Sequence, residues 1–228
     1  SDTVILITDS KRLAMLAGHL SGCEALRHVI LVDSGPDDPP EEPASHYSVH
    51  AAATLPGGEA PSRRAIDADM AAILYTSGST GRPKGVVLSH RNIVAGASSV
   101  ATYLGNNGDD RILALLPLSF DAGFSQLSTG FASGAYVHLM DYLLPRDVLR
   151  VAEEERISGI TGVPSLWNPL SRIDWPDACQ KRLRYIANTG GAMPEGTTRA
   201  LSQKLPDTSI FLMYGLTEAF RSTFLPPD

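Results

Sequence analysis

Cysteine is scarce in this chain of 228 residues: Cys23 and Cys179 are the only two, and neither belongs to a Cys-x-x-Cys pair. This spacing argues against a zinc motif and indicates free thiols in a reducing compartment. The chain also lacks a run of about 18 apolar residues, so we expect no membrane span. Its first residues lack the basic and apolar regions of a secretory signal, and we therefore expect a cytoplasmic protein.

Clusters of basic residues are absent as well. The formal net charge is −6 with no run of Lys or Arg, so nucleic acid is not expected as a partner. The hydrophobic share of 43% is enough for one large core or two small ones, and 20 glycines with 16 prolines indicate many turns. Short all-apolar runs such as residues 4–7 and 29–32 alternate with helical patterns. This alternation predicts an α/β fold with mostly parallel sheets flanked by helices, layered α-β-α.

Two regions of different character are expected. Residues 1–65 read as a β-α-β segment followed by a connection rich in Pro and Gly, and residues 66–228 carry the motifs described below. Asp9 and Asp33 follow the first two strands, where carboxylates most often serve as turn or cap residues. His46 and His50 have the spacing of some metal ligands, but no third ligand lies nearby in sequence, so we expect a solvated loop.

Residues 75–86 read Tyr-Thr-Ser-Gly-Ser-Thr-Gly-Arg-Pro-Lys-Gly-Val between two apolar runs. Glycines let the backbone approach phosphate oxygens, hydroxyls donate hydrogen bonds, and Lys84 supplies a positive charge. A plain hairpin turn is the alternative, which the density of donors disfavours. Pro83 and Gly85 flank Lys84, whereas a Walker loop has Gly-Lys-Ser/Thr followed by a helix. We therefore expect phosphates to be bound by loop side chains and amides and not by a helix N-terminus.

This segment resembles the phosphate-binding signature of the adenylate-forming superfamily. That superfamily includes AMP-forming acyl-CoA synthetases, adenylation domains of nonribosomal peptide synthetases, and luciferases. The resemblance extends to three further segments and covers nearly all of the chain. It implies that the ATP-binding residues of the loop are Thr76, Ser77, Gly78, Ser79, Thr80, Gly81 and Lys84.

The second similar segment is residues 117–124. Acyl-CoA synthetases often have Phe-His after the Pro-Leu pair, whereas amino-acid-activating domains often have Ser-Phe-Asp-Ala-Ser; this chain has Ser-Phe-Asp-Ala-Gly. The resemblance implies that Asp121 binds a substrate amine, and the alternative is that Asp121 caps the following helix. Both stay open. Trp167 lies in a segment similar to the family's acyl-pocket wall, and it either lines that pocket or packs in the core.

The last two segments each follow a predicted strand. Gly190, Gly191 and Ala192 resemble the family's adenine-pocket wall, which also forms the floor of the acyl pocket, so Gly190 is expected to contact substrate too.

Residues 214–218 read Tyr-Gly-Leu-Thr-Glu. The resemblance implies that Tyr214 and Gly215 contact adenine, that Thr217 donates to the α-phosphate and that Glu218 holds Mg²⁺. Mg²⁺ prefers oxygen ligands and is usually held by one or two carboxylates together with substrate phosphates. Without the resemblance, Glu218 would be interpreted as an acid at a helix start.

The implied reaction activates a small carboxylic acid with ATP, giving an acyl-adenylate and pyrophosphate, with Lys84, Thr217 and Glu218 as catalytic residues. The acyl group then passes to coenzyme A or to the phosphopantetheine thiol of an acyl-carrier protein. Two alternatives remain: an amino-acid-adenylating domain of a peptide synthetase, and a non-catalytic nucleotide-binding module. The family's C-terminal domain has no counterpart after Glu218, so we expect an internal fragment of the N-terminal domain that is inactive alone.

Overall fold

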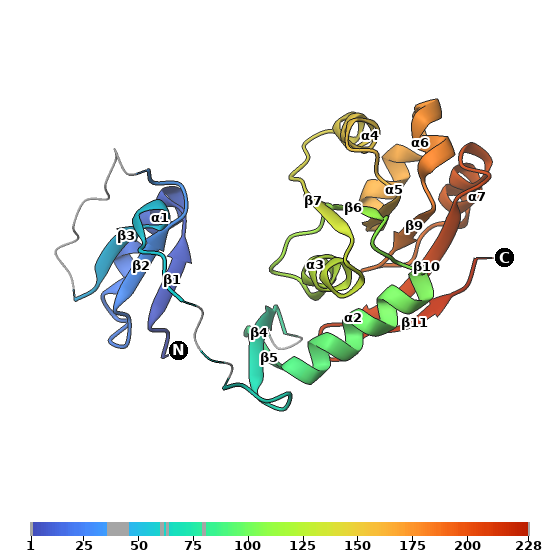
Figure 1. Ribbon diagram of the computed structural model, residues 1–228. Coiled ribbons are helices and arrows are strands. Elements are labelled where there is room, and N and C mark those ends of the chain that lie inside the picture. Colours follow the sequence, from blue (N-terminus) through green and yellow to red (C-terminus); the bar gives the residue numbers. More distant parts are fainter. Residues whose placement is uncertain (1, 36–45, 60–61, 63, 79–80, 228) are drawn as a thin grey trace. The chain divides into compact units, whose positions relative to one another are not determined.

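The computed structural model describes residues 2–35, 46–59, 62, 64–78 and 81–227. They belong to two compact units, Ser1–Arg63 and Arg64–Asp228 (Figure 1). Within the described ranges, no helix is both long and apolar enough to cross a membrane.

The first unit is a three-stranded parallel sheet with one main helix. The strands pair in the order β1-β2-β3, and the buried residues Leu20, Leu26, Val29 and Leu31 form the core. The elements are β1 (Ile5–Thr8), α1 (Ser10–Leu20), β2 (His28–Leu31), β3 (Ser48–Ala51) and the short 3₁₀ helix η1 (Ala52–Thr54). The β-α-β prediction is confirmed for β1, α1 and β2.

Polar residues at the ends of these strands play structural roles. Asp9 is the N-cap of α1 and accepts a hydrogen bond from the Arg12 backbone amide at 2.7 Å. Asp33 accepts from the amide and the hydroxyl of Ser10 at 3.0 and 3.1 Å. The prediction of turn or cap roles for both acids is therefore confirmed.

The two histidines with metal-ligand spacing have other partners. His46 Nε2 lies 2.9 Å from the Cys23 carbonyl oxygen, and His50 Nε2 lies 3.1 Å from His28 Nδ1 on the neighbouring strand. Among the residues that the structure describes, no group of three potential ligands can hold a metal ion.

The second unit is built on a six-stranded sheet with the order β11-β10-β9-β8-β6-β7. Five strands are parallel, and β11 at the edge runs antiparallel to β10. The strands are β6 (Arg111–Ala114), β7 (Tyr136–Leu139), β8 (Gly159–Gly162), β9 (Tyr185–Asn188), β10 (Ser209–Leu216) and β11 (Phe220–Leu225). The parallel strands therefore end at one edge of the sheet, where open α/β sheets bind ligands.

Helices cover both faces of this sheet, which confirms the predicted α-β-α layering (Figure 1). One face packs against α2 (His90–Leu104) and α3 (Asp121–Ser133). The opposite face forms the larger core with the other four helices: α4 (Pro145–Glu154), α5 (Pro164–Leu170), α6 (Asp177–Arg182) and α7 (Glu195–Lys204).

A pair of side chains caps the start of α2. The helix begins at His90 with Ser89 as its N-cap. Asn92 occupies the third helical position, where its side-chain oxygen accepts from the Ser89 amide at 3.0 Å while the Ser89 hydroxyl accepts from the Asn92 amide at 3.2 Å. This reciprocal capping box satisfies two amides that the helix itself leaves free.

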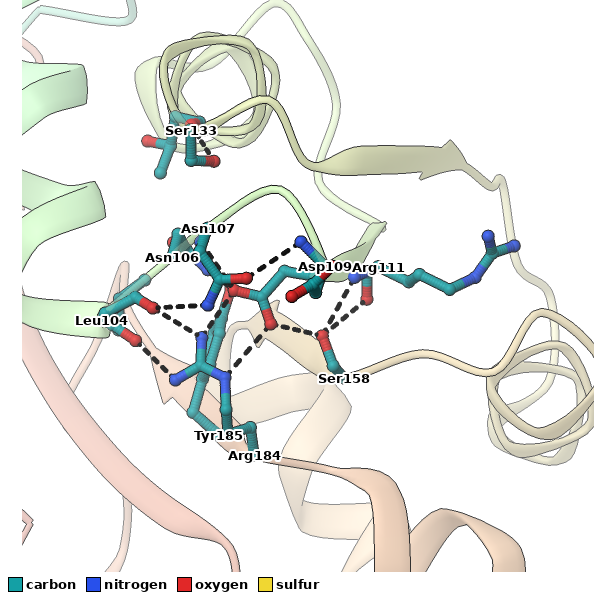
Figure 2. A network of polar contacts seen from close by, with 12 residues as sticks. Leu104, Asn106, Asn107, Asp109, Arg111, Ser133, Ser158, Arg184 and Tyr185 are labelled. Atoms are coloured by element: carbon teal, nitrogen blue, oxygen red, sulfur yellow. Dashed lines mark hydrogen bonds and ion pairs between the residues drawn. The ribbon is translucent and has the colours of Figure 1, made fainter.

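A polar network ties the amino ends of β6, β8 and β9 together (Figure 2). At its centre is Asp110, whose residue is 3% exposed. The Asp110 carboxylate accepts from Arg184 Nη2 at 2.6 Å, from the Ser158 hydroxyl at 2.7 Å and from Asn106 Nδ2 at 3.1 Å. Burial alone would raise the pKa of Asp110, but the hydrogen bonds from these three side chains outweigh it and hold the pKa below its usual value.

Candidate functional site

The loop predicted to bind phosphates joins two strands of a separate antiparallel hairpin, β4 (Met70–Thr76) and β5 (Lys84–Ser89). Thr76 pairs directly with Lys84 across the hairpin. The prediction that Lys84 leads into a strand and not a helix is therefore confirmed. One face of the hairpin is apolar and exposed: Ile73 and Val87 are 42% and 60% exposed.

Glycine is required in this loop for geometric reasons. Gly78 and Gly81 have φ angles of +63° and +77°, and the Gly81 amide donates to the Gly78 carbonyl at 3.1 Å. A side chain at Gly78 would place its Cβ 2.3 Å from the Arg82 carbonyl oxygen. Only glycine adopts such a backbone at this close approach without strain. Ser79 and Thr80, also predicted to bind ATP, lie outside the described residues.

Lys84 is an exposed residue, and in the described ranges its ammonium group forms no ion pair or hydrogen bond. Ser77 is exposed and Thr76 half-buried. A free cation beside two hydroxyls and flexible glycine amides is a donor set that fits a polyanion.

Gly190, Gly191 and Ala192 follow β9 at the carboxyl edge of the six-stranded sheet, and all three are exposed. Gly190 has φ +71°, and a Cβ there would lie 3.1 Å from Val163 Cγ1. Asn188 Nδ2 donates to the Gly191 carbonyl at 2.8 Å, which fixes the turn. The segment thus forms an open backbone surface next to the loop that follows β8.

Tyr214 and Gly215 lie near the end of β10, and Thr217 and Glu218 lie in the turn to β11. The β10–β11 pairing shifts register between Tyr214 and Leu216, and a Cβ on Gly215 would meet the Phe220 carbonyl oxygen at 1.8 Å. The bulge therefore needs glycine. Tyr214 is 67% exposed, and Glu218 is exposed without a partner in the described ranges. Glu218 belongs to a turn between strands, so its interpretation as a helix-start acid is wrong.

Asp121 is the first residue of α3, but its side chain does not cap that helix. Phe120 is the N-cap and makes no side-chain cap bond. The Asp121 carboxylate instead accepts a hydrogen bond from the Thr217 hydroxyl at 3.4 Å. This contact brings together residues from the second and fourth motifs, 96 positions apart in the chain. The cap interpretation of Asp121 is therefore wrong.

Trp167 has no exposed surface and belongs to the main hydrophobic core with Leu166 and Leu170. A fully enclosed ring leaves no face for a ligand, so core packing describes this residue and we leave it out of the substrate pocket proposed below.

Three of the four motifs therefore share the carboxyl edge of one sheet. β9 ends at Asn188, which pairs with Leu212, so residues 190–192 leave the sheet beside the last part of β10. Thr217 and Glu218 follow the end of β10, and Asp121 contacts Thr217. In the described residues, no hydrogen bond or ion pair connects the β4–β5 hairpin with that edge.

Sequence reasoning missed Arg221, a buried guanidinium on β11 whose Nη2 donates to the Ala122 carbonyl at 2.8 Å. A single arginine in a short strand carries no pattern of its own. Its significance depends on the β10–β11 register, which turns this side chain inward beneath α3.

Comparison with known proteins decides the family. The model of the family described as AMP-binding enzyme matches residues 1–228. The chain belongs to the AMP-binding enzyme family. This confirms the resemblance to adenylate-forming enzymes.

Several curated family members are similar over about two thirds of the chain. Bacitracin synthase 3 of Bacillus licheniformis is 34% identical over 153 residues, which is 66% of this chain and 2% of that protein. L-proline--[L-prolyl-carrier protein] ligase of Streptomyces coelicolor is 35% identical over 162 residues, covering 68% of this chain and 30% of the ligase. This chain spans only 2% to 38% of the lengths of such relatives.

Solved structures of AMP-binding enzymes share the fold. Apo MatB from Rhodopseudomonas palustris superimposes with a TM-score of 0.80 at 22% identity, over 100% of this chain and 43% of MatB. The N-terminal domain of FACL13 from Mycobacterium tuberculosis gives a TM-score of 0.74 at 23% identity, over 98% and 59% of the two chains. The chain therefore shares the fold of a large part of that N-terminal domain.

Proposed function

We propose that this chain supplies the nucleotide-binding core of an AMP-forming ligase that activates a carboxylic acid with ATP. The observation that carries the proposal is the β4–β5 hairpin, in which Thr76 faces Lys84 across a loop with two glycines at positive φ. The described part of the loop presents a cation and hydroxyls on a glycine-containing backbone, and the strand β5 follows it in place of a helix N-terminus. Family membership supports nucleotide binding at this place.

In the proposed reaction a carboxylate oxygen of the substrate attacks the α-phosphorus of ATP. The new O–P bond forms as the bond to the bridging oxygen breaks, and pyrophosphate leaves with the electron pair. Both reactants are anions, so the protein must neutralise charge and align them. Lys84, Thr76, Ser77 and the loop amides bind the β- and γ-phosphates, and the Thr217 hydroxyl donates to the α-phosphate.

The carboxyl edge of the sheet holds the remaining parts of the substrates. Tyr214 offers an exposed ring on which adenine stacks, and the backbone of residues 190–192 forms the wall between the adenine and acyl subsites. Glu218 fits a magnesium ligand, because it is an exposed carboxylate without a protein partner in the described ranges, next to the proposed α-phosphate donor. Mg²⁺ bound there with the phosphates supplies further charge neutralisation.

Transfer to a thiol completes the proposed function. Two relatives, an L-prolyl-carrier protein ligase and a propanoyl:CoA ligase, support a carrier-bound phosphopantetheine or coenzyme A as the acceptor. The thiolate attacks the acyl carbon, and AMP leaves.

A second candidate is an amino-acid-adenylating domain. It is favoured by Asp121, a half-buried carboxylate that does not cap its helix and accepts one hydrogen bond, from Thr217. Such a carboxylate has lone pairs left for a substrate ammonium group.

ATP–pyrophosphate exchange by the full-length protein, with panels of fatty, aryl and amino acids, tests both candidates. Exchange that depends on a fatty or aryl acid supports the first, and exchange on an amino acid that is lost in Asp121→Asn supports the second. A third possibility is a module that binds ATP without catalysis. Titration of ATP with and without Mg²⁺, using Glu218→Ala as control, tests for it. Binding without any exchange would identify a non-catalytic nucleotide-binding module and overturn the proposal.

A further inference from the structure

Arg221 is a buried cation without a carboxylate partner in the part of the chain that the structure describes. The residue is 6% exposed, and its Nη2 donates to the Ala122 carbonyl at 2.8 Å. Its Nε is buried and has no hydrogen-bond acceptor among the described residues. Burying a charge without an ion pair costs free energy, and this cost indicates that Arg221 has a specific role.

The space around Arg221 is too small for a substrate. It lies against a cavity of about 10 Å³ that is lined on its polar side by Ser125, Gln126, Thr129, Thr161 and Tyr185. Such a volume accommodates about one water molecule. Arg221 therefore acts on the protein around it and not directly on a ligand.

The groups that interact electrostatically with Arg221 are Tyr103 on α2, Asp121 on α3 and Tyr185 on β9. Burial raises the pKa of both tyrosines to about 12, so they are neutral at physiological pH. Asp121 is therefore the one negative charge among them. Burial lowers the pKa of Arg221, and the charge of Asp121 opposes that shift.

The bond to Ala122 holds the residue next to Asp121. The first turn of α3 has no side-chain cap, and a Cβ on Gly123 would lie 2.1 Å from the Pro117 carbonyl oxygen, so this turn sits tightly against the chain that leaves β6. Arg221 fastens the same turn from the β11 side. The position of Asp121 relative to Thr217 thus depends on a contact outside the ligand subsites.

We propose that Arg221 is a positioning residue for the acid subsite: it fastens the first turn of α3 through Ala122 and holds the ionised Asp121 carboxylate at the Thr217 hydroxyl. The inference rests on the proposed function. It implies that the acid subsite contains a carboxylate that is fixed in place before substrate arrives.

A double-mutant cycle in the full-length protein tests this role. Acid-dependent ATP–pyrophosphate exchange is measured for the wild type, Arg221→Met, Asp121→Asn and the double variant. We expect Arg221→Met to raise KM for the acid about tenfold with less than a twofold change in KM for ATP, and the double variant to be no worse than the poorer single variant. Equal effects on both KM values, or multiplicative losses, would overturn the proposal.

Two controls address folding. Arg221→Lys keeps the charge and is expected to restore most of the affinity for the acid, whereas Arg199→Met removes an exposed arginine on α7 and should have no effect. If none of the acids supports pyrophosphate exchange by the wild type, the proposed function fails. Thermal unfolding of the wild type, the two single variants and the double variant still tests the Arg221–Asp121 coupling. A smaller Tm loss from Arg221→Met in the Asp121→Asn background supports it, and equal losses contradict it.

Discussion

The hydroxyl of Thr217 donates to the carboxylate of Asp121 at 3.4 Å. A threonine hydroxyl has a single proton to donate. If the Thr217 hydroxyl donates its hydrogen bond to the α-phosphate of ATP, Asp121 loses its donor. Occupation of the nucleotide subsite and the hydrogen bonding of the acid subsite are therefore linked in the proposed site.

This linkage predicts that Asp121→Ala tightens ATP binding. The substitution removes both a competing acceptor and a negative charge near the phosphate, and one hydrogen bond of about 1 kcal/mol corresponds to roughly a fivefold change. Calorimetric titration of ATP measures the effect, with Asp109→Ala as a control at the opposite edge of the sheet. Weaker ATP binding in Asp121→Ala would contradict the linkage.

Lys84→Ala is expected to weaken ATP binding about 10- to 100-fold, because a charge-assisted hydrogen bond contributes roughly 1.5–3 kcal/mol. The thermal midpoint should stay unchanged, since Lys84 is exposed and has no ion pair in the described part of the chain. Lys11→Ala on α1 is the charge-matched control. Titration of ATP and differential scanning fluorimetry on the same samples check both expectations, and unaltered affinity would exclude Lys84 from the phosphate site.

Gly215→Ala is expected to impair nucleotide binding and to lower the free energy of unfolding by more than about 1 kcal/mol, since overpacking against backbone costs roughly 1–3 kcal/mol. The new Cβ would sit 1.8 Å from the Phe220 carbonyl oxygen and open the β10–β11 bulge that presents Tyr214 and Thr217. Gly196→Ala, where a Cβ meets open space in α7, is the matched control. Urea unfolding should give a clearly lower free energy of unfolding for Gly215→Ala than for Gly196→Ala. Equal free energies would contradict the requirement for glycine at position 215.

Asp110→Asn is expected to destabilise the protein by about 1.5 kcal/mol at pH 7, because a neutral amide weakens the charge-assisted hydrogen bond from Arg184, whose side chain is 41% exposed. The pKa of Asp110 is lowered in the folded state, so its stabilisation is fully present above the unfolded value of about 4 and is lost as pH falls through the lower folded value. Urea unfolding at pH 7 and at pH 3 should show the gap between wild type and variant closing in acid. Asp109→Asn, exposed and adjacent, controls for charge, and a gap that is independent of pH would refute the ionic role.

Cys179 is expected to resist thiol reagents in the folded protein. Burial raises its pKa to about 11, and the Glu153 charge adds to the shift, so little thiolate exists at neutral pH. Cys23 is half-buried and should react first. Mass spectrometry after maleimide treatment, with and without urea, checks the order; labelling of Cys179 without unfolding would contradict it.

Much of the fold could be predicted from the sequence, because local signals dominate it. All-apolar runs such as residues 4–7 and 29–32 placed strands, and the apolar runs on either side of the Gly-rich motif form the two strands of a hairpin, a geometry that the density of donors had counted against. Errors arose where the outcome depended on neighbours in space. A helix cap was one of two interpretations of Asp121, but its carboxylate accepts instead from Thr217, 96 positions away in the chain.

The candidate site was predictable only in its motifs. Which of them meet is decided by strand order: β9 beside β10 places residues 190–192 next to the last part of β10, and the Thr217–Asp121 contact requires α3 and the β10–β11 turn to be adjacent. The inward direction of Arg221 and the enclosure of Trp167 likewise follow from packing and not from sequence pattern.

Exchange of labelled pyrophosphate into ATP by the full-length protein tests the central claim most directly. The account predicts exchange that requires one class of carboxylic acid and Mg²⁺ and that falls by at least about tenfold in Lys84→Ala, in proportion to the lost phosphate contact. No exchange with any acid, or exchange that is undiminished in Lys84→Ala, would contradict it.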